Sequence, residues 1–63
     1  MNRKKKYLYD VTVEDYSMMD TFFRIPADTY QEAAQIAKRR FVKRYWNRKL
    51  LKAHMESKSE NLF

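Results

Sequence analysis

The 63-residue sequence contains no cysteine and no glycine, and only one proline and one histidine. Without cysteine, neither a disulfide framework nor a thiolate metal site can supplement the core of so short a chain. A domain of this size buries only roughly 60% of the surface that its unfolded chain exposes, so its stability margin is small. The sequence therefore predicts at most one domain, held together by noncovalent packing alone.

Long apolar runs are also missing. The longest such run is three residues, Tyr7-Leu8-Tyr9, whereas a helix that crosses a bilayer needs ~20. The basic start of the chain, residues 1–6, is not followed by the hydrophobic stretch of a signal peptide. We expect a cytoplasmic protein without membrane contact.

The residue patterns of enzymes and metal sites are absent from this sequence. There is no glycine-rich phosphate loop, and His54 has neither a cysteine nor a second histidine at ligand spacing. Three serines and one histidine cannot supply a nucleophile, a base and an orienting group. We expect a binding protein with no catalytic residue, metal, cofactor or small-molecule substrate.

Positive charge is abundant and segregated along the chain. The net charge is +6, but residues 38–52 alone carry +8 with no acidic residue among them, and residues 1–6 carry +4. Residues 7–37 carry −5. Because such a basic block repels itself, it is favoured by an anionic partner, either nucleic acid or an acidic protein surface.

The first half of the chain has the pattern of a β-hairpin. From Tyr7 to Glu14, apolar and polar side chains alternate with the period of a half-buried strand. A second segment of β-type composition covers about residues 21–25 and is closed by Pro26. The connection is expected to be loose, because a tight type I′ turn favours glycine.

The second half is expected to be helical. Thr29 and Glu32 have the spacing of a capping box, in which the Glu32 carboxylate reaches back to the Thr29 amide. Asp28 is a competing cap. We predict a helix over about residues 29–56, with Asn47 as its one plausible interruption, and a flexible tail at 57–63.

Two apolar stripes run along this predicted helix. The first is expected to pack on the hairpin and comprises Tyr30, Ala33, Ala34, Ala37, Phe41 and Tyr45. The second lies on roughly the opposite side and comprises Val42, Trp46, Leu50 and Ala53. The hairpin and the helix up to Tyr45 have similar lengths, near 25 Å. Residues 46–55 should therefore pack on a second copy, dock on a partner, or fold back at Asn47.

These expectations define the fold class as α+β. Residues 7–56 form a single ββα domain, in which an antiparallel hairpin packs on one long C-terminal helix, and residues 1–6 form a basic flexible arm. A homodimer would be held by the second stripe, through Val42, Trp46 and Leu50.

The first functional hypothesis is that the protein binds DNA or RNA. Between residues 38 and 49, basic residues alternate with aromatic ones on the predicted helix. Such a face can follow a phosphate backbone by displacing its counterions, and the arm can add contacts. The candidate residues are Arg3, Lys4, Lys5, Lys6, Arg39, Arg40, Lys43, Arg44, Asn47 and Arg48.

The alternative hypothesis is a protein partner. The only tryptophan, Trp46, can serve as an interface anchor, and the hairpin loop with Tyr16, Met18 and Met19 can serve as an adaptable contact surface. In this second interpretation, a phage or mobile-element protein binds and modulates a host protein through Trp46 and the loop.

One family resemblance can be stated. The strand at residues 9–13, and the segment Phe23 to Ala37 with its Ala-Asp-Thr and Glu-Ala-Ala motifs, resemble small hairpin-then-helix proteins of phages and plasmids of the DpnD/PcfM-like kind. Such proteins often continue with an acidic helix and another strand, where this chain continues into basic residues. The resemblance implies an accessory protein of a mobile element and carries over no functional residue.

Overall fold

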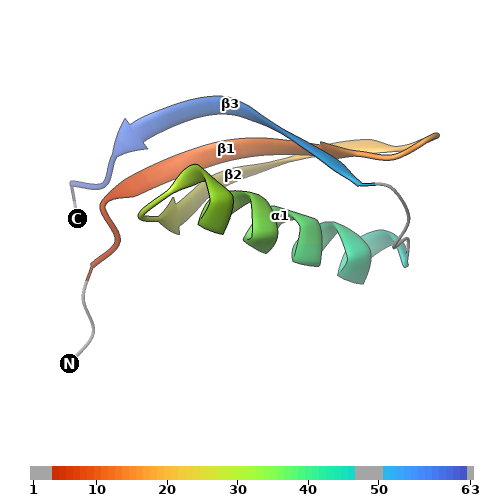
Figure 1. The fold of residues 1–63 in the computed structure, drawn as a ribbon, viewed down its shortest axis with the longest axis horizontal. Coiled ribbons are helices and arrows are strands. Elements are labelled where there is room, and N and C mark those ends of the chain that lie inside the picture. Colours follow the sequence, from red (N-terminus) through yellow and green to blue (C-terminus); the bar gives the residue numbers. More distant parts are fainter. Residues whose placement is uncertain (1–3, 47–50, 63) are drawn as a thin grey trace.

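The fold, seen in a computed structural model that describes residues 4–46 and 51–62, is a three-stranded antiparallel sheet with one helix across a face (Figure 1). The strand order is β2-β1-β3, so β1 is central. The elements in chain order are β1 (Tyr7–Glu14), β2 (Met19–Ala27), α1 (Tyr30–Tyr45) and β3 (Lys52–Glu60).

Strand β1 pairs with both neighbours along its whole length. Tyr7 lies opposite Ala27 on one side and Glu60 on the other, and Glu14 lies opposite Met19 and Lys52. The predicted alternation appears in the burial pattern, with Tyr9, Val11 and Val13 buried toward the helix. The alternating pattern therefore predicted the first strand at the residues that form it.

The chain makes its tight bends without glycine. In the hairpin loop, the Asp15 carboxylate accepts hydrogen bonds from the backbone N–H groups of Ser17 and Met18, both at 2.8 Å. In β2 a bulge places Arg24 at φ 56°, and the Arg24 N–H donates to the Asp10 carboxylate at 2.9 Å. Aspartate side chains thus stabilise backbone geometry that glycine usually provides.

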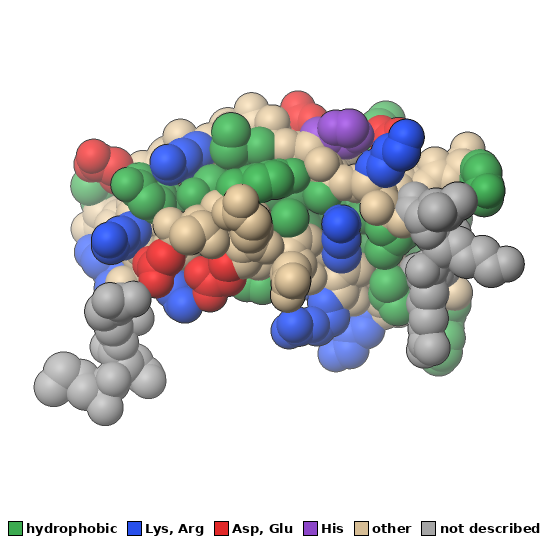
Figure 2. All heavy atoms as spheres, in the orientation of Figure 1, with side chains coloured by type: hydrophobic (Ala, Val, Ile, Leu, Met, Phe, Trp, Pro, Cys, Tyr) green, Lys and Arg blue, Asp and Glu red, His purple; other side chains and the backbone are tan. Residues whose placement is uncertain are grey.

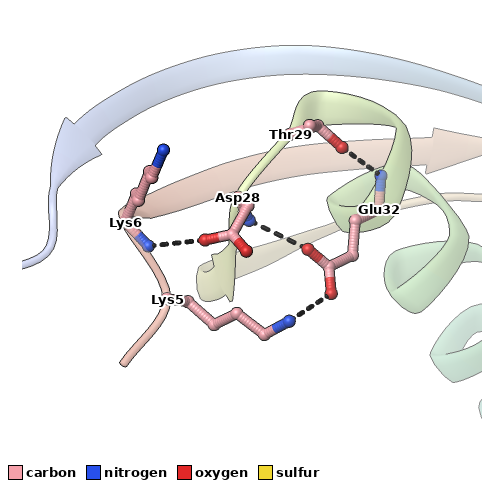
Figure 3. A network of polar contacts seen from close by, with 5 residues as sticks. All are labelled: Lys5, Lys6, Asp28, Thr29 and Glu32. Atoms are coloured by element: carbon pink, nitrogen blue, oxygen red, sulfur yellow. Dashed lines mark hydrogen bonds and ion pairs between the residues drawn. The ribbon is translucent and has the colours of Figure 1, made fainter. Parts of the chain in front are cut away.

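The helix begins at the predicted cap, in a network shown in Figure 3. The Thr29 hydroxyl accepts from the Glu32 N–H at 3.2 Å, as in a capping box. The Glu32 carboxylate reaches the N–H of Asp28, at 2.9 Å, and not that of Thr29 as expected. Lys5 forms an ion pair with Glu32 at 2.7 Å and thereby lowers the pKa of that carboxyl group.

The core lies between the helix and the inner face of the sheet. The largest fully buried side chains are Phe41, Ile25, Val11 and Val13. Of the first predicted stripe, the three alanines and Phe41 are buried, and Tyr30 and Tyr45 pack at its two ends. Alanines at these positions leave room for the helix to lie close to the sheet.

The helix ends at Tyr45, so the predicted helix over 29–56 and the ββα architecture are wrong. The residue after Tyr45, Trp46, adopts a left-handed conformation (φ 59°, ψ 27°), and residues 52–60 return as β3. The helix is therefore in the middle of a ββαβ fold, although the α+β class is confirmed. The physical reason is that β1 needs hydrogen-bonding partners along both of its edges, and the hairpin supplies only one.

Residues 57–61 of the predicted flexible tail are held by β-sheet pairing and hydrogen bonds, contrary to the prediction. Ser57 to Glu60 belong to β3, and the Asn61 N–H donates to the Lys6 carbonyl at 2.9 Å. The Asn61 side chain donates to the Lys5 carbonyl at 3.0 Å. The chain segments that precede β1 and follow β3 therefore lie side by side (Figure 1).

Candidate nucleic-acid interface

The candidate site is the solvent-facing side of the last two turns of α1. Ala37 and Phe41 are buried against the sheet, so the intervening cations project outward. In Figure 2 the Lys and Arg side chains gather over this half of α1, away from the sheet. We call this surface the basic helix face; its members are Arg39, Arg40, Lys43 and Arg44, all exposed.

One member of the basic helix face is fixed by contacts to β2. The Arg44 guanidinium forms an ion pair with Asp20 at 2.6 Å and lies over the Phe22 ring, 5.3 Å from its centroid. Asp20 also accepts a hydrogen bond from the Tyr45 hydroxyl at 2.8 Å. The Tyr45 hydroxyl first, and then Arg44, lower the pKa of the Asp20 carboxyl group below 3.8, and Asp20 raises the pKa of Arg44.

The other three members have no acidic neighbour. Within residues 4–46 and 51–62, Arg39, Arg40 and Lys43 form no ion pair with a carboxylate. Arg40 and Lys43 line an open depression of about 530 Å³ together with Arg44 and Phe22. This depression is the part of the face where an anion would meet several cations at once.

The helix dipole explains only part of this arrangement. The negative end of a helix favours cations in its last turn, which holds Lys43 and Arg44. Arg39 and Arg40 lie a turn earlier, where this effect has largely fallen off. Cations adjacent in the sequence repel each other, and a bound anion would offset this repulsion.

The hairpin loop lies at the same end of the molecule as the helix C-terminus (Figure 1). Met19 adjoins Asp20, and Trp46 adjoins Tyr45, and the carboxylate of Asp20 accepts the Tyr45 hydroxyl. Both segments carry exposed apolar side chains at this end of the molecule. They comprise Tyr16, Met18, Met19 and Trp46.

The residues of the predicted interface stripe do not share one continuous helix. Because α1 stops at Tyr45, Val42 and Trp46 do not continue along a helix to a third member, and Leu50 lies outside the described residues. Val42 is half-buried and its carbonyl accepts the Trp46 N–H at 2.8 Å. Val42 and Trp46 therefore lie on either side of the helix end, and the homodimer through Val42, Trp46 and Leu50 stays a prediction.

The described residues of the predicted N-terminal arm, 4–6, lie away from the basic helix face. Lys5 pairs with Glu32, and the Lys6 N–H donates to Asp28 at 2.9 Å, so these two residues are held at the start of the helix and are not a flexible arm. Lys4 is exposed beside them. The remaining candidates Arg3, Asn47 and Arg48 lie outside the described residues.

The acidic residues on the uncovered face of the sheet are engaged in local contacts. Asp10 accepts from the Ser57 hydroxyl at 2.8 Å, and Glu14 lies 3.3 Å from the His54 imidazole. Among the described residues there is no group of three or more His, Cys, Asp or Glu side chains suited to a metal ion. No helix in the described part of the chain is long and apolar enough to span a membrane.

Comparisons with known proteins gave no match: no family model, no curated protein and no solved structure is similar to this chain. The contribution of Asp20 and Phe22 to the site could not be found in the sequence either, because it depends on how residues 20–22 and 40–45 meet in space. The basic helix face is therefore the feature of the fold from which a function can be inferred.

Proposed function

We propose that this protein binds nucleic acid through the basic helix face. The observation that carries the proposal is that Arg39, Arg40 and Lys43 project from one side of α1 without a carboxylate partner among the described residues. A phosphate backbone would supply the missing negative charge at several points along one line. Binding would release the counterions condensed on those phosphates, and this release drives the association.

The number of phosphates that the basic helix face can contact determines how strongly salt should weaken binding. If three or four phosphates are neutralised, the logarithm of the duplex affinity falls with a slope of about −2.7 to −3.6 against the logarithm of salt concentration. Between 50 and 200 mM salt the affinity should then fall roughly 40- to 150-fold. Arg40 and Lys43, the two cations of the depression that are not paired with a carboxylate among the described residues, should account for about half of that slope.

The experiment is a fluorescence anisotropy titration of labelled DNA and RNA at these two salt concentrations. The test variant is Arg40→Ala/Lys43→Ala, and the matched control is Lys52→Ala/Lys58→Ala, which removes the same charge from β3. The test variant should lose affinity and show a slope smaller by roughly 2. Undetectable binding at 50 mM salt, or equal losses in both double variants, would contradict the proposal.

A second candidate function is binding to an acidic protein surface through the end of the molecule that carries the hairpin loop. Tyr16 is 85% exposed and Met19 is 68% exposed, and Met19 directly precedes Asp20, which pairs with Arg44 of the basic helix face. Exposed aromatic and methionine side chains fit an apolar pocket, and the cations of the basic helix face would attract an acidic border of that pocket.

The two functions respond differently to changes in the loop. Met18→Ser/Met19→Ser keeps all charges and should leave oligonucleotide affinity unchanged under the first proposal. Under the second, the same variant should fail to retain a protein that wild-type protein captures, while Arg40→Ala/Lys43→Ala should mainly slow association. Equal capture by the wild type and the loop variant would exclude the second candidate.

A further inference from the structure

We propose that Trp46 is a base-stacking residue and that single strands, not duplexes, are the preferred ligand of this protein. This inference rests on the proposed function and specifies its substrate class. Trp46 belongs neither to the core nor to a helix or strand.

Packing within the fold does not explain why this position holds a tryptophan. The side chain is 85% exposed and is absent from the residues that pack on the core. Its backbone is in the left-handed region, where a bulky residue is disfavoured and glycine or asparagine fits well. Residues held in such conformations cluster at binding sites. The position thus carries a large exposed ring where the backbone would favour a small residue.

The backbone that carries the indole is nevertheless held in a defined place. The backbone N–H of Trp46 donates to the Val42 carbonyl at 2.8 Å, and the preceding two residues, Arg44 and Tyr45, are both bonded to Asp20. The ring is therefore attached to a backbone segment that the sheet anchors. A ring on a fixed backbone loses less conformational freedom when it binds.

The arrangement matches what single-strand binding requires. Proteins that bind single strands combine cations along the backbone with an aromatic ring on which a base can stack. Here the cations of the depression, Arg40 and Lys43, lie within two turns of the ring in the chain. A strand with its phosphates at the depression would bring an unpaired base to the indole.

The short length of the basic helix face also favours single strands. From Arg39 to Arg44 the helix rises about 7.5 Å, whereas one turn of duplex DNA measures about 34 Å. In a duplex the bases are already stacked on each other and offer no free face to the indole. A duplex would gain the phosphate contacts only.

The experiment uses the only tryptophan of the chain as its own reporter. Protein fluorescence is followed during titration with an eight-nucleotide single strand, with the same strand made abasic, and with the matching duplex at 50 mM salt. The intact single strand should quench Trp46 and bind more tightly than the other two. The abasic strand carries the same phosphates and therefore isolates the contribution of the bases.

Trp46→Gly separates binding from folding. Because glycine suits the left-handed backbone, this variant should unfold at a higher urea concentration than wild type, and it should bind the labelled single strand 5- to 150-fold more weakly. Trp46→Phe should keep part of the affinity. Weaker binding by a protein of greater stability cannot be caused by unfolding.

Equal affinity for the intact and abasic strands, or unchanged single-strand affinity in Trp46→Gly, would overturn this inference and leave the proposed function standing. Tighter binding to the duplex than to the single strand would overturn it in the same way. No binding to any of the three ligands at 50 mM salt would overturn the proposed function itself.

Discussion

The Tyr45 hydroxyl donates a hydrogen bond to the Asp20 carboxylate at 2.8 Å, across 25 positions of sequence. The same oxygen of Asp20 receives Arg44 at 2.6 Å. This contact joins the last turn of the helix to the first residues of β2. It therefore fixes the end of the molecule where the basic helix face and the hairpin loop meet.

Removing this hydroxyl should weaken the fold at neutral pH. Tyr45→Phe should lower the free energy of unfolding by about 1 kcal/mol, because a hydrogen bond to a charged acceptor is lost. The pKa of Asp20 is lowered in the folded state, so its contribution is fully present above its unfolded pKa and is lost as pH falls through the folded value, below 3.8.

Urea unfolding at pH 7 and pH 2 tests whether this contribution to stability decreases as the pH falls. The difference between wild type and Tyr45→Phe should be smaller at pH 2 than at pH 7, because the Asp20 carboxylate gains a proton as the pH falls. Tyr30→Phe is the matched control, since the Tyr30 hydroxyl has no hydrogen-bond partner among the described residues. A difference that stays the same at both pH values would show that the bond does not depend on the carboxylate charge.

Two phenylalanines of very different burial give a paired test of the core. Phe41 is fully buried and packs on Tyr45 with ring centroids 4.8 Å apart, whereas Phe23 is 66% exposed. Phe41→Ala should cost about 3–5 kcal/mol, which approaches the whole stability of so small a domain. Phe23→Ala should change stability by about 0.5 kcal/mol or less. Thermal unfolding followed by circular dichroism would show whether the two variants differ in this way.

The bulge in β2 predicts a stabilising substitution. Arg24 has φ 56°, a region that a side chain with a Cβ atom disfavours. Arg24→Gly should raise the free energy of unfolding by about 0.5–1 kcal/mol relative to Arg24→Ala, which removes the same charge and keeps the Cβ atom. The urea midpoints of the two variants measure this difference. A lower midpoint for glycine than for alanine would argue against the left-handed bulge.

The third strand distinguishes the observed fold from a ββα domain. Deleting residues 52–63 should abolish cooperative urea unfolding, because β1 would lose its pairing from Tyr7 to Glu14 on one side. Deleting only residues 62–63 is the control and should leave the transition in place. A truncated protein with the urea midpoint of the full chain would mean that β3 contributes nothing to the fold.

The elements that the sequence predicts correctly are those with a strong periodic pattern. Residues 7–14 alternate in polarity, and Thr29 and Glu32 have the spacing of a cap, so the first strand and the helix start were found. The helix end had no such signal. Its stop is a tryptophan in a left-handed conformation, and the residues that follow it up to Lys52 are mostly good helix formers.

The strand β3 was missed for a related reason. It is almost entirely polar and exposed, with Ala53 and Met55 as its only apolar residues, and a bulge between Ser57 and Met55 disturbs even this alternation. Its place is determined by the unpaired edge of β1 and not by its own composition. The basic helix face was predicted because its residues are adjacent in sequence, whereas the anchoring role of Asp20 depends on tertiary packing.

The hydrogen bond between Asn61 and Lys6 also determines how the molecule can be attached to anything else. It brings the segments before β1 and after β3 together at one end, and the basic helix face lies toward the other end of a molecule whose longest dimension is 37 Å (Figure 1). A tag or a surface linker joined at either side would thus leave the end with the basic helix face open to solution. Immobilising the protein through either segment should therefore keep the proposed binding surface accessible.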